Sequence, residues 1–98
     1  MSNQVKLHNE VNLVGRIMSK QKDVRCNNRK AIKVKLAVPN DDNYELEPNI
    51  AYVYIYDDGE INNSLNRLQA IAINGHIESN WNQRIICDVL SIIKESSR

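Results

Sequence analysis

Three tyrosines stand at alternate positions of one short segment, 50-IAYVYIY-56, in a sequence with four tyrosines, one tryptophan and no phenylalanine. Successive side chains of a β-strand point to opposite faces. A strand here would therefore carry Tyr52, Tyr54 and Tyr56 on one face and aliphatic side chains on the other. Tyrosine rings on an exposed strand face can stack on the bases of a single-stranded nucleic acid.

The segment 31–38 would supply cations beside these rings. Its aliphatic side chains alternate with Lys33 and Lys35, which is typical of a strand with one face in the core and one in solvent. If the aliphatic faces of both segments fill one core, the two lysines share the outer face with the tyrosines. Lysines that hold phosphates next to rings that stack on bases are typical of single-strand binders. The alternative is that the tyrosines only pack across a sheet.

Two further candidates lie in or next to a turn predicted at 79–83. Trp81 lies within this turn, where little core is available to bury an indole. We expect it to stack on a base or to contact a second subunit, and the alternative is that it folds back against its own hairpin. Arg84, which begins the next segment, is a further candidate nucleic-acid contact.

The charges are segregated along the sequence although the net charge is only +1. Residues 16–35 contain eight basic side chains and one acidic side chain, a net charge of +7, and residues 41–60 contain seven acidic side chains and no basic one. This separation favours a site for a polyanion. The alternative is two solvated loops of opposite sign that attract each other.

Five strands and one helix are expected to position these residues. Hydrophobic alternation predicts strands at 5–18, 31–38, 50–56, 70–79 and 84–93. Between the third and fourth strands, Ile61, Leu65 and Leu68 have the spacing of a short amphipathic helix within 57–69, which Asp57 or Asp58 could cap.

Glycines inside the first and fourth strands, Gly15 and Gly75, are candidate bends of a barrel. The order of elements, β-β-β-α-β-β, predicts an all-β fold, the five-stranded Greek-key barrel known as the OB-fold. The length fits one domain over 1–98, with frayed ends at about 1–4 and 95–98. The expected core is Leu13, Val34, Leu36, Val53, Ile55, Leu65, Ile73 and Val89.

The predicted fifth strand, 84–93, is apolar on both faces. A barrel of this size can bury one face of a strand but not easily both. The strand is therefore either central in the sheet or covered by a partner. We therefore expect a homodimer or a homotetramer that associates through surfaces of the first or fifth strand.

Other classes of function find little support in the sequence. Cys26 and Cys87 lack the spacing of a disulfide framework or a zinc site, and His8 and His76 complete no metal constellation. The acidic run 41–60 contains no arrangement that fixes a metal. We expect no catalytic residue, no cofactor and no metal. No signal peptide or membrane span is apparent, so a cytoplasmic protein is expected.

Three stretches resemble bacterial single-stranded DNA-binding proteins. The run 9-NEVNLVGRI-17 is similar to the Asn-x-Val-x-Leu-Val/Ile-Gly-Arg-Leu pattern of their opening strand, 23–40 resembles the next segment, and 73–81 the strand that leads into the last hairpin. The similarity covers roughly residues 5–93.

The resemblance implies an OB-fold, single-stranded DNA binding without strong sequence preference, and assembly into dimers or tetramers. By position, Arg16 matches the family's arginine after glycine, and Tyr56 and Trp81 fall where the family has aromatics. The sequence departs from the family at 39–42, Pro-Asn-Asp-Asp, where an aromatic is usual, and it lacks an acidic C-terminal tip. A reduced relative is expected, similar to a primosomal replication protein of the OB type or to a phage- or plasmid-encoded version.

The first hypothesis is thus a non-catalytic binder of single-stranded DNA in replication, recombination or mobile-element transfer. The second is an OB-fold module that docks on a replication, primosome or conjugation protein and has little affinity for nucleic acid. The modest net charge and the doubly apolar segment 84–93 favour the second.

Overall fold

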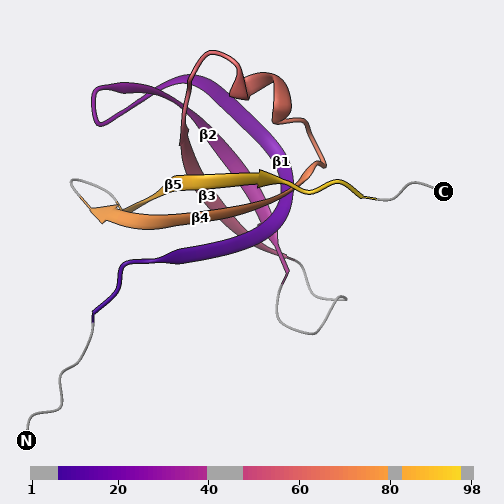
Figure 1. The fold of residues 1–98 in the computed structure, drawn as a ribbon, viewed down its shortest axis with the longest axis horizontal. Coiled ribbons are helices and arrows are strands. Elements are labelled where there is room, and N and C mark those ends of the chain that lie inside the picture. Colours follow the sequence, from indigo (N-terminus) through magenta and orange to yellow (C-terminus); the bar gives the residue numbers. More distant parts are fainter. Residues whose placement is uncertain (1–6, 40–47, 80–82, 96–98) are drawn as a thin grey trace, which may run out of the picture.

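The computed structural model describes residues 7–39, 48–79 and 83–95, which form a closed five-stranded barrel (Figure 1). The strands are β1 (Val11–Cys26), β2 (Arg29–Val38), β3 (Asn49–Tyr56), β4 (Ala70–Ser79) and β5 (Gln83–Ile92). Their order around the barrel is β1-β2-β3-β5-β4. The β3–β5 contact is parallel and the other four are antiparallel. The predicted OB-fold is confirmed.

The first strand differs from the predicted segment 5–18. It begins at Val11 and continues to Cys26, curving around the barrel so that its first part pairs with β4 and its second part with β2 (Figure 1). The second part is rich in polar residues, so it offers no hydrophobic alternation to read. It forms a long hairpin with β2 whose turn residues, Asn27 and Asn28, have φ values of 52° and 63°. Asparagine tolerates this left-handed conformation, which two-residue hairpin turns require.

Most of the predicted core is confirmed. The side chains of Val34, Leu36, Val53, Ile55, Leu65 and Ile73 are buried, and Leu13 is half-buried against them. The prediction for Val89 is wrong, because 59% of this residue is exposed.

A β-bulge in β5 explains the error. Asn74 of β4 pairs with Val89, but the next residue, Gly75, pairs with Cys87, so Asp88 is the extra residue of a bulge. Cys87 faces the core before the bulge and Leu90 faces it afterwards. The bulge exchanges the two faces of the strand, so Ile85 and Cys87 before it and Leu90 and Ile92 after it point to the same core. Ile86, on the other face, is buried in a second cluster of this chain. The apparently doubly apolar strand is therefore no evidence of a covering partner.

Close backbone approach accounts for the two strand glycines. A Cβ atom at Gly75 would collide with the carbonyl oxygen of Ile86, and one at Gly15 with the carbonyl oxygen of Ala37. Any larger residue would push the neighbouring strand away, so both positions admit only glycine at this spacing.

The predicted helix within 57–69 is a single 3₁₀ turn, η1 (Ile61–Ser64). Asp58 lies two residues before the N-cap residue of this turn, Glu60, which makes no side-chain cap bond. The Oδ1 atom of Asp58 accepts the N–H groups of Glu60 and Ile61 at 2.8 Å each. These bonds also lower the pKa of Asp58. Leu65 enters the core, but Leu68 is 52% exposed, so no continuous apolar stripe forms. No helix in the described part of the chain is both long enough and apolar enough to cross a membrane.

Candidate nucleic-acid interface

The outer face of β2 and β3 brings the predicted lysines and tyrosines together. The antiparallel register places Lys33 opposite Tyr54 and Lys35 opposite Tyr52, while Val34 and Val53, of the other parity, are fully buried. The predicted alternation of the two strands is therefore confirmed. The Lys33 ammonium lies 4.9 Å from the ring centre of Tyr52 and 5.8 Å from that of Tyr54, within the roughly 6 Å reach of a cation–π contact.

The three rings differ in accessibility. Tyr52 is 49% exposed, and Tyr54 and Tyr56 are half-buried. The two half-buried rings pack against a small cluster outside the barrel core, formed by Cys26, Ala31 and Ile86. This cluster holds the two rings in place and leaves part of each surface open, whereas Tyr52 is free to meet a ligand.

Two arginines extend this face. The guanidinium carbon of Arg84 lies 5.2 Å from the ring centre of Tyr54, and that of Arg29 lies 3.9 Å from the ring centre of Tyr56. The Arg84 guanidinium also donates to Cys26 Sγ at 3.7 Å. Arg29 was not among the sequence candidates, although it shares the parity of Lys33. The predicted strand began at residue 31, two residues after the observed start.

Lys20 of β1 is a third lysine beside Lys33 and Lys35. It lines a shallow pocket of about 110 Å³, whose other lining residues are Ser19, Gln21, Lys33, Lys35 and Tyr52. The Lys20 ammonium donates to the carbonyl oxygen of Asn62 at 2.6 Å, which holds it in place. Three cations and a tyrosine around one small depression suit a phosphate group. Lys20 escaped the sequence analysis because the first strand was expected to end at residue 18.

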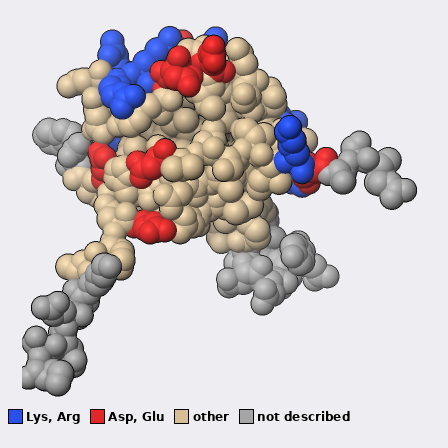
Figure 2. Space-filling model, in the orientation of Figure 1, with Lys and Arg blue, Asp and Glu red and all other residues tan. Residues whose placement is uncertain are grey.

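The basic segment folds largely into the β1–β2 hairpin. Figure 2 shows Lys and Arg gathered over the end of the molecule where this hairpin lies in Figure 1. Its one acidic residue, Asp23, pairs with Lys30 at 3.1 Å. Acidic side chains lie directly beside these basic ones in Figure 2, so the described surface does not separate the two signs as the sequence does. Residues 40–47, which hold four of the seven acidic residues of the run 41–60, lie outside the described residues.

One predicted site residue, Arg16, is not brought into this row. The guanidinium of Arg16 donates to both carboxylate oxygens of Glu95 at 2.7 and 2.6 Å and to the carbonyl oxygen of Leu68 at 3.0 Å. These bonds to Arg16 lower the pKa of Glu95. Arg16 pairs with Ala37, at the end of β2 away from Arg29. Trp81 lies outside the described residues.

The two cysteines are buried in the fold. Cys26 and Cys87 are both buried and free, and burial raises the pKa of Cys87 to about 11. In residues 7–39, 48–79 and 83–95, no group of three or more His, Cys, Asp or Glu side chains is arranged to hold a metal ion.

Solved structures with this fold were found at low sequence identity. The mitochondrial single-stranded DNA-binding protein Rim1 of S. cerevisiae gives a TM-score of 0.68 at 13% identity, over 89% of this chain and 96% of that one. The N-terminal domain of PriB from Thermoanaerobacter tencongensis, a dimeric structure, gives 0.71 at 18% identity, over 89% and 98%. A deletion mutant of the single-stranded DNA-binding protein of Thermus aquaticus gives 0.70 at 17% identity, over 93% of this chain and 43% of that longer one.

Sequence comparison adds nothing to this likeness, because no protein-family model and no curated protein matches the chain. The resemblance seen in the sequence is confirmed at the level of the fold. The chain therefore shares the OB-fold of single-stranded DNA-binding proteins and of PriB.

Proposed function

We propose that this protein binds single-stranded DNA, largely without sequence preference, along the outer face of β2 and β3. The observation that carries the proposal is the row in which Lys33 and Lys35 stand directly opposite Tyr54 and Tyr52. A ring beside a cation repeats along the strands, as the bases and phosphates of a nucleic-acid strand do. Every base has a face to stack on a ring, so such binding tolerates any sequence.

The residues of this face divide into two roles. The tyrosines stack on bases, each contact being worth on the order of 1–3 kcal/mol. The lysines, together with Arg29 and Arg84, neutralise phosphates and release counterions. Trp81, in the β4–β5 connection, and Arg16, at the far end of the face, are the outlying candidates for further contacts. No catalytic step is part of this proposal.

The structural neighbours support the proposal, since Rim1 and the Thermus aquaticus protein are single-stranded DNA-binding proteins. A role in replication, recombination or mobile-element transfer is inferred from that class of protein. The test is a fluorescence titration of the tyrosines and tryptophan with oligo-dT at two salt concentrations. Quenching that saturates and weakens with salt supports the proposal. Equal affinity for duplex DNA of the same length, or no quenching, would argue against it.

We further propose that the protein associates with a second copy through the outer face of β1, β4 and β5. Val14 of β1 is 55% exposed and Val89 of β5 is 59% exposed. Both line a groove of about 260 Å³ in which Ala72, Ser91 and the amides of Asn12 and Asn74 are the other outward side chains. Exposed apolar side chains gathered at a shallow groove favour a protein contact, and the PriB neighbour is a dimer.

A replication or primosome protein is the alternative occupant of this groove. Sedimentation of the purified protein at micromolar concentration distinguishes the two. A homodimer or homotetramer supports self-association, and a monomer over the whole range would favour the other partner.

A further inference from the structure

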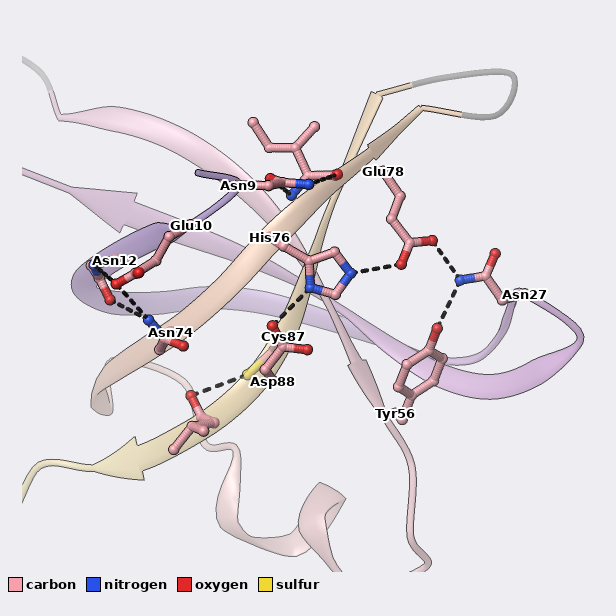
Figure 3. Close-up of polar contacts among 12 residues, drawn as sticks. Asn9, Glu10, Asn12, Asn27, Tyr56, Asn74, His76, Glu78, Cys87 and Asp88 are labelled. Carbon is pink, nitrogen blue, oxygen red and sulfur yellow. Dashed lines mark hydrogen bonds and ion pairs between the residues drawn. The ribbon is translucent and has the colours of Figure 1, made fainter. Parts of the chain in front are cut away.

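A polar network lies beside the tyrosine row and is centred on His76 of β4 (Figure 3). Its Nδ1 is 2.7 Å from Oδ2 of Asp88, and its Nε2 is 2.6 Å from Oε2 of Glu78. A neutral imidazole has one N–H group and one lone pair, so it can donate to only one carboxylate. Carboxylates at both nitrogens therefore match the protonated ring, which donates to each.

The network continues from Glu78 to the tyrosine row. The other oxygen of Glu78, Oε1, accepts a hydrogen bond of 2.8 Å from the side-chain amide of Asn27, which also donates to the hydroxyl of Tyr56 at 2.8 Å (Figure 3). An amide NH₂ has two hydrogens, one for each of these acceptors. Asn27 sits in the β1–β2 turn, so the chain of bonds joins β4, the hairpin turn and β3. The Tyr56 ring held in this way carries Arg29 at 3.9 Å.

We propose that His76 is a positioning residue for the nucleic-acid interface: its protonated ring holds Glu78 so that Asn27 fixes the β1–β2 turn and Tyr56 in the geometry that binds the strand. Loss of that proton weakens binding. This inference rests on the proposed function, and it adds a proton-linked control that the tyrosine row alone does not have.

The charges around His76 determine the pH range in which the ring loses its proton. Asp88 of β5, then Glu78, raises the pKa of His76 above its ordinary value of about 6.5. The bond to His76, then that to Asn27, lowers the pKa of Glu78. On the β5 side, Arg84 is the residue directly opposite Glu78 in the register of β4 and β5. On the β1 side, Glu10 accepts a bond of 3.3 Å from the amide of Asn74. The acidic groups around the ring outnumber the arginine, and they favour the protonated form of His76.

Proton loss removes one donor from the network. The positioning role requires that the neutral ring keeps its Nδ1 proton for Asp88. Glu78 then faces the lone pair of Nε2 and is released from the orientation that accepts the Asn27 amide. The local charge also becomes more negative by one unit, which repels phosphate in its own right. The test must therefore separate positioning from charge.

The first measurement uses the free protein and needs no DNA. The ring signals of His76, the side-chain amide of Asn27 and the ring of Tyr56 are followed by NMR from about pH 5.5 to 9. We expect the Asn27 and Tyr56 signals to shift with the same midpoint as His76, and to lose that transition in His76→Gln. Signals of Asn27 that ignore the His76 midpoint would overturn the proposal.

The second measurement is oligo-dT affinity over the same pH range for the wild type, His76→Gln, Asn27→Ala and the double variant. A change of about 0.5–1 pKa unit on binding corresponds to a roughly three- to tenfold loss of affinity across the titration. We expect this loss in the wild type, a flat profile in His76→Gln, and a shallower slope in Asn27→Ala, which keeps only the effect of the His76 charge. The double variant should be no weaker than the weaker single variant, because both act through one network. His8→Gln, at the other histidine, serves as the matched control and should keep the wild-type slope.

The outcomes separate the two proposals. If Asn27→Ala binds with the wild-type pH slope, the dependence is charge alone and the positioning role is wrong. A wild type that binds without any pH slope overturns the role of His76 and leaves the proposed function intact. No binding at any pH contradicts the proposed function, and the NMR titration then decides the network by itself.

Discussion

Two outer faces of one small barrel differ in chemistry more than in shape. On β2 and β3, rings alternate with cations, as where Tyr54 faces Lys33. Around the groove on β1, β4 and β5, the outward side chains are aliphatic, small or amide-bearing, with Val14 and Val89 the most exposed large ones. A strand presents one of its two faces outward whatever its sequence, so the barrel does not decide what each face binds. The side chains do, and the contrast predicts a nucleic acid on the first face and a protein on the second.

The largest effect is expected on the second face. In a dimer, burial of each valine side chain would contribute up to about 1.5–3 kcal/mol to the free energy of association. Val14→Asp combined with Val89→Asp replaces both valines with carboxylates. Self-association should weaken by at least roughly 100-fold, as measured by sedimentation. Affinity for oligo-dT per protomer should change less than about twofold. An unchanged association constant would remove this face as the interface.

The next effect is expected on the first face. Tyr54→Ala should weaken oligo-dT binding by roughly 1–3 kcal/mol, whereas Tyr54→Phe should stay near the wild type, because stacking needs the ring and not the hydroxyl. Both variants should keep the barrel. Tyr54 also packs on Ile86, so a thermal melt of each variant must accompany the titration. Equal binding by the alanine variant and the wild type would leave protein docking as the better account.

The lysines should leave a different signature from the tyrosines. Lys33→Ala and Lys35→Ala should each flatten the salt dependence of oligo-dT affinity by about 0.7 in log–log slope, the increment for one phosphate contact on a single strand. Tyr54→Ala should lower affinity at every salt concentration without changing that slope. Titrations at four or more salt concentrations measure both quantities. A tyrosine variant that changes the slope as a lysine variant does would contradict this division of roles.

The smallest effect is expected at Arg16. Its guanidinium and the Glu95 carboxylate are about half exposed, and such exposed pairs contribute little to stability because water screens them. Arg16→Ala should therefore change oligo-dT affinity and unfolding free energy only slightly. The lowered pKa of Glu95 means that the pair contributes above the unfolded pKa of Glu95 and is lost as pH falls through its folded pKa. Urea unfolding at pH 7 and pH 3 measures the difference against Glu95→Gln. If Arg16→Ala lost as much oligo-dT affinity as Tyr54→Ala, Arg16 would have to break its ion pair with Glu95 and bind the DNA strand.

The sequence was sufficient to predict the first face because its strands are regular. The alternation of Lys33 and Lys35 with aliphatics, and of the tyrosines with Val53 and Ile55, survives unbroken in the structure. In a strand without a bulge, the alternation of residues alone decides which side chains face the core and which face outward.

The second face could not be predicted in the same way. The bulge at Asp88 moves Val89 outward, and a bulge leaves little trace in hydrophobic alternation. The partner of Arg16 is 79 residues away in the sequence, and such a contact follows only from the closed barrel. Arg29 and Lys20 were missed because strand ends were placed by apolar alternation, which stops where the polar hairpin begins.

The most direct test of this account maps oligo-dT on the protein by ¹H–¹⁵N chemical-shift changes. The account predicts that the largest changes gather at Lys33, Lys35, Tyr52 and Tyr54, and that Val14 and Val89 move little. Changes centred on Val14 and Val89, with the tyrosine row unmoved, would contradict it.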